Sequence, residues 1–271
     1  MSRPDQSITF LRSFGYSVFR FPRASAQPLE LMHRDGKDLT RLGTVTQLVS
    51  PGSVPVPTVR RDDRPGIDIE GRETSAINVG IGLSMLGSFI GALGGSSLGL
   101  QAGFTRARTV TFTYAGVMED SVDVLAVEQF VKAGTLSPLI PSGTLEKLLD
   151  DEIYVVTSVL KTARIAVSAQ GEAGNSIQLD VPVIQQAVGG NLKVDASGGL
   201  ASKVTFEGAT PIAFALQAVQ LVFDESGEFL TTEQLPAGDA AARAAGRAAA
   251  ASGRRGPVFL ESRGAFVRVG S

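Results

Sequence analysis

Side chains that could carry out acid–base or nucleophilic chemistry are few and widely spaced in this chain. His33 is the single histidine, and as a catalytic base it would need an oriented nucleophile and a third partner group. Acidic pairs at 62–63 and 150–152 could act as paired carboxylates, but solvated turns and helix ends favour aspartate for structural reasons. We therefore predict that the protein is not an enzyme, and that His33 lies at the surface or at a strand end.

The sequence also gives little support for a cofactor site or a metal site. The string Gly80-Ile-Gly82 lacks the third glycine of a dinucleotide fingerprint, and no phosphate-binding P-loop occurs. Cysteine is absent, which excludes disulfides, thiolate zinc and a cysteine nucleophile. A lone histidine leaves little for a transition metal. We predict no cofactor and no catalytic, cofactor-binding or metal site.

Composition indicates a folded protein without a nucleic-acid partner. The 271 residues include 25 Lys plus Arg and 27 Asp plus Glu, so the formal net charge of −2 provides no basic field. Hydrophobic residues make up 43% of the chain, which is enough for a substantial core. The first six residues are polar and do not look like a secretory signal, so we expect a cytoplasmic protein.

The elements that must position any site are mostly strands. Runs rich in β-branched and aromatic residues predict strands over 107–117, 152–169 and 191–206, while 212–223 fits a strand or a buried helix. Helical spacing is seen at 120–133 and 145–149. This irregular mixture predicts an α+β fold: a single domain on a large twisted, mostly antiparallel sheet, with peripheral helices and a short C-terminal peptide docked on it.

The longest stretch without a charge runs from Thr74 to Thr105, and glycine recurs in it every four residues. In a helix this spacing would place on one face the glycines Gly87, Gly91, Gly95, Gly99 and Gly103. Such a face is typical of membrane helices, but the frequent glycine and serine also fit a buried helix and turn in a soluble core. Because glycine adopts several backbone conformations, the segment would also suit a change from helix to strand.

Two later segments alternate apolar and polar side chains. In 162–170 the residues Ala163, Ile165, Val167 and Ala169 share one face, and in 191–197 Leu192, Val194 and Ala196 do so. A membrane β-strand needs this pattern, and so does a half-buried strand of a soluble sheet. The sequence alone leaves both possibilities open.

Large apolar side chains disappear from the C-terminal part of the sequence and then return. Residues 236–256 contain no large apolar side chain and are interpreted as a linker, because they bury too little surface to offset the entropy of ordering. Apolar side chains then return, namely Val258, Phe259, Leu260, Phe266 and Val267. Left exposed they would favour aggregation, so we expect this tail to dock on the main domain.

Taken together, residues 8–230 resemble the bacterial gasdermins. The resemblance is carried by Phe14-Gly-Tyr-Ser-Val-Phe-Arg-Phe-Pro-Arg23, Pro28-Leu-Glu-Leu31, Pro55 and Pro57, Ile69-Glu-Gly71, Gly82-Leu-Ser-Met-Leu-Gly87, Gly91-Ala-Leu-Gly-Gly95 and Val110-Thr-Phe-Thr-Tyr114. It implies a pore-forming domain over 1–236, a protease-sensitive linker over 237–256 and an autoinhibitory peptide over 257–271. The implied protein is a latent cell-death effector. Its N-terminal part, once cut free, inserts into the inner membrane as a large β-barrel and limits phage spread.

The resemblance also implies partners and site residues. The partners are an activating protease, membrane lipids after cleavage, and further copies of the chain in the pore, with a monomer in the latent state. Cleavage candidates are Arg243, Arg247, Arg254 and Arg255; the inhibitory tail comprises Val258, Phe259, Leu260, Phe266 and Val267. Membrane-inserting candidates, within 74–115 and 153–207, are Leu86, Phe89, Ile90, Leu93, Val110, Phe112, Ile165, Val167, Leu192 and Val194.

One departure from the family concerns lipidation. Several bacterial gasdermins carry an acylated cysteine near the N-terminus, whereas Ser7 stands in about that place here. Thioester acylation is therefore not possible at this position. The competing hypothesis for the whole chain is a soluble β-rich interaction or scaffold module with a disordered C-terminal end.

Overall fold

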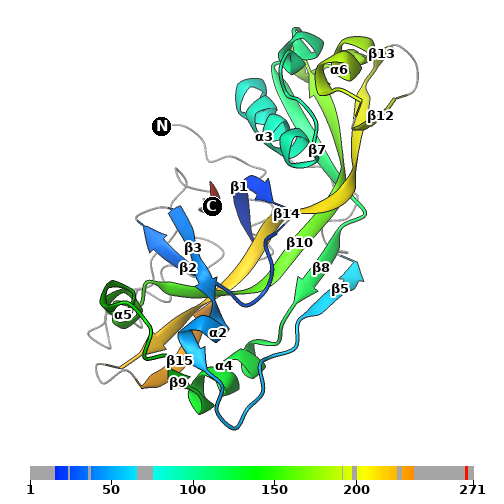
Figure 1. Ribbon diagram of the computed structural model, residues 1–271. Coiled ribbons are helices and arrows are strands. Elements are labelled where there is room, and N and C mark those ends of the chain that lie inside the picture. Colours follow the sequence, from blue (N-terminus) through cyan, green and yellow to red (C-terminus); the bar gives the residue numbers. More distant parts are fainter. Residues whose placement is uncertain are drawn as a thin grey trace.

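Two long strands, β10 (Ile153–Gln170) and β14 (Lys203–Phe223), pair antiparallel and run from one end of the molecule to the other (Figure 1). They form the axis of a computed structural model that describes residues 16–23, 25–35, 38–65, 76–190, 192–196, 200–224, 228–234 and 266–267. The 18 and 21 residues of these strands are rich in β-branched and aromatic side chains, as strand propensity requires.

Shorter strands cover both outer edges of this ribbon. Along β10 lie β2 (Glu30–Asp35), β8 (Met118–Ser121) and β7 (Thr109–Ala115). Along β14 lie β12 (Lys193–Asp195), β1 (Ser17–Arg23) and β15 (Phe229–Gln234). Further out lie β3 (Asp38–Thr44), β5 (Arg60–Pro65), β6 (Ile77–Asn78) and β16 (Phe266–Val267), which complete a 12-stranded sheet. Among the described pairings only β1 with β16 is parallel, so the predicted α+β fold on a mostly antiparallel sheet is confirmed.

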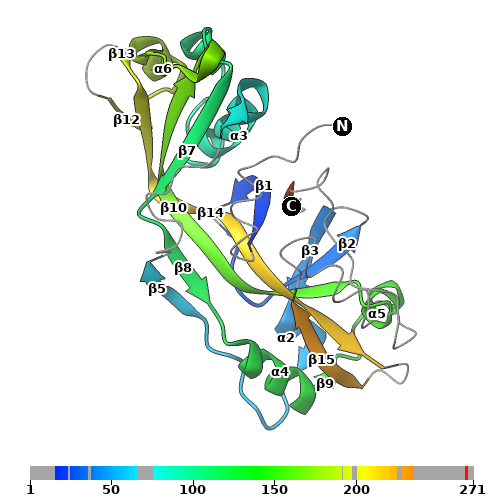
Figure 2. The same ribbon diagram turned by 180° about the vertical axis from the view of Figure 1, so that it is seen from behind.

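One lobe is built on the end of the ribbon where β7 and β12 pair with it. Its helices are α3 (Val79–Ala92), the 3-10 turns η1 (Leu100–Phe104) and η2 (Glu172–Gly174), and α6 (Val181–Val188), with the small pair β11 (Leu179–Asp180) and β13 (Leu200–Ala201) beside them. We call this the upper lobe, after its place in Figures 1 and 2. Asn78 starts α3 by accepting the N–H of Gly80 through its side chain at 3.0 Å.

The lower lobe is built on the other end. It contains α2 (Val45–Leu48), α4 (Val124–Ala133) and α5 (Ser142–Leu149), together with the small pair β4 (Val49–Ser50) and β9 (Thr135–Leu136). Buried side chains from α4, β2, β10 and β14 form its main apolar core, which includes Phe130, Ile153 and Leu221. This core is separate from that of the upper lobe.

The lobes meet at a break in the ladder, which we call the neck and define as 115–120, 158–164 and 207–212. Between the pairs Thr162–Ile212 and Arg164–Glu207, β10 has a single residue and β14 has residues 208–211. Thr162 is fully buried, and its hydroxyl donates to the carbonyl of Ala115 at 2.5 Å. Gly116, with a φ of 64°, joins β7 to β8 at the same level.

Several expectations need correction. The glycines at 87–103 do not share one helix face, because α3 ends at Ala92 and the chain turns at Gly94 with a φ of 89°. The segment ending at 206 and the one starting at 212 belong to the single strand β14, and the latter is not a helix. Acidic residues 62–63 lie within β5 rather than in a turn.

Candidate functional site

The upper lobe gathers the side chains that the sequence pointed to for membrane insertion. Leu86, Phe89, Ile90 and Leu93 come from α3 and its C-terminal end, and all are buried. They pack in one cluster with side chains from the sheet and the loop before β12, namely Val110, Phe112, Ile165, Val167 and Leu192, and the partly buried Val194 lies against it. Segments about 100 residues apart in the sequence therefore form one apolar core. The role of these residues in a membrane stays a prediction.

The predicted alternation is present in the strands of this lobe. In β10, Ile165, Val167 and Ala169 are buried, while Arg164 on the opposite face is exposed. In and beside β12, Leu192 is buried, whereas the side chains of 193 and 195 are exposed. One face of this sheet is thus apolar and covered by α3, η1 and α6, and the structure keeps it away from water (Figure 2).

Small residues let α3 and the following loop approach the sheet closely. A Cβ placed on Gly82 would lie 2.1 Å from Cγ2 of Val110, and one on Gly95 would lie 2.0 Å from Cδ1 of Leu192. Neither distance is possible for real carbon atoms, so a larger residue at either position would require Val110, Leu192 or the backbone to shift. The glycine-rich composition therefore serves close packing over the apolar face in this state.

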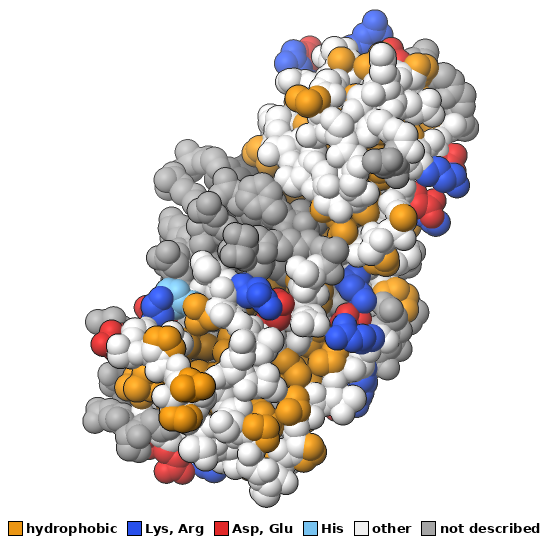
Figure 3. Space-filling model, in the orientation of Figure 1, with side chains coloured by type: hydrophobic (Ala, Val, Ile, Leu, Met, Phe, Trp, Pro, Cys, Tyr) orange, Lys and Arg blue, Asp and Glu red, His pale blue; other side chains and the backbone are white. Residues whose placement is uncertain are grey.

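Charged side chains lie around this lobe rather than over α3 (Figure 3). No Asp, Glu, Lys or Arg occurs in 76–105. At the rim, Arg164 donates to Glu207 at 2.9 Å, and the Nζ of Lys193 lies 3.8 Å from the same carboxylate. The hydrogen bond from Arg164 holds the pKa of the Glu207 carboxyl below its ordinary value.

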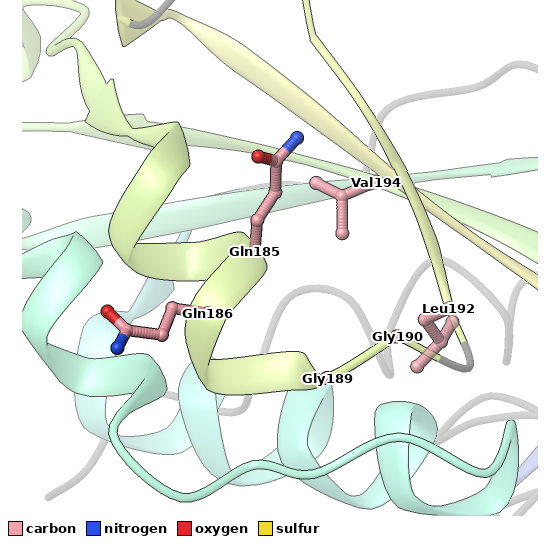
Figure 4. A pocket seen from close by; sticks show the side chains of 6 residues that line it. All are labelled: Gln185, Gln186, Gly189, Gly190, Leu192 and Val194. Atoms are coloured by element: carbon pink, nitrogen blue, oxygen red, sulfur yellow. The ribbon is translucent and has the colours of Figure 1, made fainter.

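Two hollows lie on this lobe whose described lining residues include no titratable side chain. One, of about 450 Å³, lies between the end of α6 and β12 (Figure 4); its lining consists of Gln185, Gln186, Gly189, Gly190, Leu192 and Val194. A second groove of about 540 Å³ follows α3; it is lined by Gly80, Leu83, Ser84, Gly87, Ser88, Ser97, Leu100 and Gln101. In the described residues no three His, Asp or Glu side chains gather as a metal site would require.

His33 lies in the lower lobe, within β2, and is largely buried rather than at the surface. Its Nε2 is 3.1 Å from the Glu152 carboxylate, and its Nδ1 is 3.5 Å from Nζ of Lys147. Asp150 is the C-cap residue of α5, as expected of a helix end. The contact with Lys147 ties α5 to β2, an inner strand that lies between β10 and β3.

The C-terminal strand β16 lies on the outer edge of β1. Phe266 pairs with Val18 and Val267 with Phe19, in parallel orientation. Strand β1 in turn pairs with β14 just below the neck and lies against α3. The last described segment of the chain thus reaches the strand that lies between α3 and the central ribbon (Figure 1).

Other predicted site residues lie outside the described residues. These are Ser7, the cleavage candidates Arg243, Arg247, Arg254 and Arg255, and the tail residues Val258, Phe259 and Leu260. Residues 237–256 lie outside them as well, so the division into domain, linker and tail stays a prediction.

Sequence reasoning missed a polar group at the neck. Asp120 is buried, its Oδ1 is 2.8 Å from Nζ of Lys161, and its Oδ2 is 3.8 Å from Nη1 of Arg61. The neighbouring Glu119 accepts hydrogen bonds from Ser158 at 2.5 Å and from Tyr16 at 3.3 Å. The sequence pointed to the position of the neck, although not to this polar group. Gly208 and Pro211 interrupt an otherwise strand-like stretch, and such residues mark a break in a ladder.

Comparison with known proteins identifies this arrangement. The family model described as the Bacterial Gasdermin Family matches residues 19–228. The chain belongs to the bacterial gasdermin family. A gasdermin of a Desulfuromonadales bacterium is 36% identical over 98% of this chain and 97% of its own length. A gasdermin of Lysobacter enzymogenes is 39% identical over 95% of this chain and 94% of its own length.

Solved structures agree on the fold. The structure of a bacterial gasdermin from Bradyrhizobium tropiciagri aligns with a TM-score of 0.59 over 86% of this chain and 92% of its own, at 14% identity. Gasdermins are pore-forming proteins and not enzymes. At the level of the family, this confirms the prediction of a pore-forming protein and the prediction that the chain is not an enzyme. Within the described part of this gasdermin, no helix is both long enough and apolar enough to span a bilayer.

Proposed function

We propose that this gasdermin is a latent pore-former that is activated when a protease removes its C-terminal peptide. The freed N-terminal part, roughly residues 1–236, then oligomerises and inserts into the inner membrane as a large β-barrel. Death of the infected cell would limit phage spread. The intact chain is a cytoplasmic monomer in this proposal.

The observation that carries the proposal is the apolar face of the upper lobe. Its strands already alternate apolar and polar side chains, as a membrane strand must, and their apolar side chains are packed under α3, η1 and α6. Each buried Leu, Ile, Val or Phe contributes about 1.5–3 kcal/mol relative to water exposure, so the face cannot open in water without a large cost. In lipid that cost disappears.

Strand β16 supports the role given to the tail. By pairing with β1 it satisfies backbone groups on an open sheet edge, on the strand that lies against α3. While the linker is intact, the tail is held near this edge at an effective concentration of about millimolar, and cleavage replaces this by dilution. We expect the tail to leave after cleavage and the edge of β1 to become free.

Insertion has to be oligomeric, because a lone hairpin in lipid would leave the backbone groups of its edges without partners. Closing a barrel with further copies of the chain removes those edges. The four arginines proposed for cleavage lie between Gln234 of β15 and Phe266 of β16, so a cut after any of them separates the tail from the sheet.

The first test is dye release from liposomes. A site-specific protease sequence replaces residues 248–252, and the purified protein is cut in the presence of liposomes made from bacterial inner-membrane lipids. Release is expected only after the cut. The matched control keeps residues 248–252 unchanged and receives the same protease. A cut protein that has lost its tail and still releases no dye would contradict the proposal.

A second test uses cells. Expression of residues 1–237 is expected to arrest growth, whereas the full chain is harmless. Phage challenge of cells carrying the full chain and its natural protease then tests the antiphage role. A soluble scaffold module predicts instead that removal of 238–271 changes neither growth nor membrane integrity.

A further inference from the structure

Tyr16 connects two strands that are not neighbours in the sheet. It directly precedes β1, and its hydroxyl donates to Oε1 of Glu119 in β8 at 3.3 Å. Strands β14 and β10 lie between β1 and β8. Because adjacent strands are about 4.8 Å apart, this contact bridges roughly 14 Å of sheet. The Tyr16 side chain therefore crosses the face of the central ribbon and packs on the core of the upper lobe.

The acceptor end of this contact is firmly held. Glu119 Oε1 also accepts the hydroxyl of Ser158 in β10 at 2.5 Å. The next residue, Asp120, is buried and ion-paired with Lys161, one residue before the neck residue Thr162. Charge-assisted hydrogen bonds of this kind are about twice as strong as neutral ones. Tyr16 is thus tied to a rigid part of the neck.

The donor end is held much less firmly. In the described part of the chain, strand β1 pairs with β14 through Ser17, Val18 and Arg23, with an irregular register between the last two. Its other edge is occupied by the tail strand β16. When the tail leaves, β1 keeps this interrupted ladder, its contact with α3, and the link through Tyr16.

We propose that the Tyr16 hydroxyl is a latch that holds β1 to the neck, so that the upper lobe opens only after this hydrogen bond breaks. Tyr16 is a positioning residue in this scheme, because it acts through β1 on the cover of the apolar face. The inference rests on the proposed function, because the latch would set the rate at which the upper lobe opens after the tail has been released.

The test compares Tyr16→Phe with Tyr114→Phe. Tyr114 lies in the same core, stacked on Phe214 with ring centroids 4.3 Å apart, but it belongs to β7. After cleavage, Tyr16→Phe is expected to shorten the lag before dye release by about 3- to 10-fold. This is the range for a hydrogen bond of typical net strength, because the 3.3 Å contact with Glu119 is a long one. In the intact protein, the backbone amides of Ser17 and Val18 are expected to exchange hydrogen faster by a similar factor. Tyr114→Phe is expected to change neither quantity.

Glu119→Gln adds a second arm. It is expected to act in the same direction, and the double variant with Tyr16→Phe is expected to be no faster than the faster single variant, because both remove one interaction. Unchanged exchange and lag in Tyr16→Phe, or equal changes in Tyr16→Phe and Tyr114→Phe, would overturn the latch. If the cut wild-type protein released no dye, the proposed function would fail, while the exchange rates of the intact variants would still decide on the latch.

Discussion

Replacing Gly82 by alanine is expected to destabilise the closed protein, although alanine is the better helix former. A Cβ at this position would lie 2.1 Å from Cγ2 of Val110. Val110 is fully buried and branched at Cβ, so its methyl groups have few alternative positions. Carbon atoms prefer about 3.5–4.0 Å, and α3 would have to move outward by roughly 1.5 Å.

The magnitude follows from two opposing effects. Alanine in place of glycine inside a helix gains about 1 kcal/mol. Overpacking a dense core costs about 1–3 kcal/mol, and a shift of α3 also loosens the buried side chains of Leu86, Phe89 and Ile90. We expect a net loss of up to about 2 kcal/mol, which for a chain of this size lowers Tm by up to about 4–8 °C.

Gly91→Ala is the matched control, because Gly91 lies in the same helix and nothing is within 4 Å of a Cβ placed there. This variant is expected to raise Tm by about 2–3 °C through helix propensity alone. Scanning calorimetry of both intact variants provides the comparison. If Gly82→Ala raised Tm as much as Gly91→Ala does, the packing of α3 on β7 described above would be wrong.

Three further predictions concern the charges and the tail. Asp120→Asn leaves the ammonium group of Lys161 without its close carboxylate and is expected to cost about 2–4 kcal/mol in urea unfolding; a loss under about 1 kcal/mol would contradict a buried pair. Because Arg164 lowers the pKa of Glu207 in the fold, this pair stabilises above pH 4.5 and ceases to do so as the pH falls through the lowered value. The difference in Tm between wild type and Glu207→Gln is therefore expected to be largest at pH 6 and to shrink as the pH falls below 4.5 through the lowered pKa; a constant difference would refute this sign. Val267→Pro removes a backbone donor from β16 and is expected to release dye from liposomes without cleavage, whereas a variant as silent as wild type would argue against inhibition by this strand.

Much of the architecture could be predicted from local sequence. The alternation in 162–170 is a strong signal of period two, and it identified the strand and its buried face correctly. The helices α4 and α5 also lie where helical spacing indicated them, within a few residues. These elements were predictable because each buries one of its faces, and the resulting spacing of apolar residues can be recognised within the segment itself.

The glycine run shows why the rest was not predictable. A spacing of four suits a helix face, but α3 has only 14 residues, and the backbone leaves it at Gly94. Whether a glycine packs in a helix or turns with positive φ depends on what lies opposite, here Val110 and Leu192. That information resides in distant parts of the chain.

The neck and the Tyr16 contact are non-local in the same way. Tyr16 and Glu119 are 103 positions apart, and only the order of strands in the sheet brings them together. Nothing in either local sequence distinguishes them from other half-buried polar residues. The burial of His33 likewise follows from its place between α5 and the sheet rather than from its neighbours in the sequence.

The unequal spacing at the neck has a geometric consequence. Opposite the single residue between Thr162 and Arg164, β14 carries residues 208–211, which is three residues too many for a regular ladder. Three is an odd number, and side chains of a strand change sides at every step. If the ribbon became one uninterrupted hairpin, one half of β14 would have to turn its inward row outward. A β10–β14 ladder without irregularities therefore could not keep the side chains of both cores on their present faces.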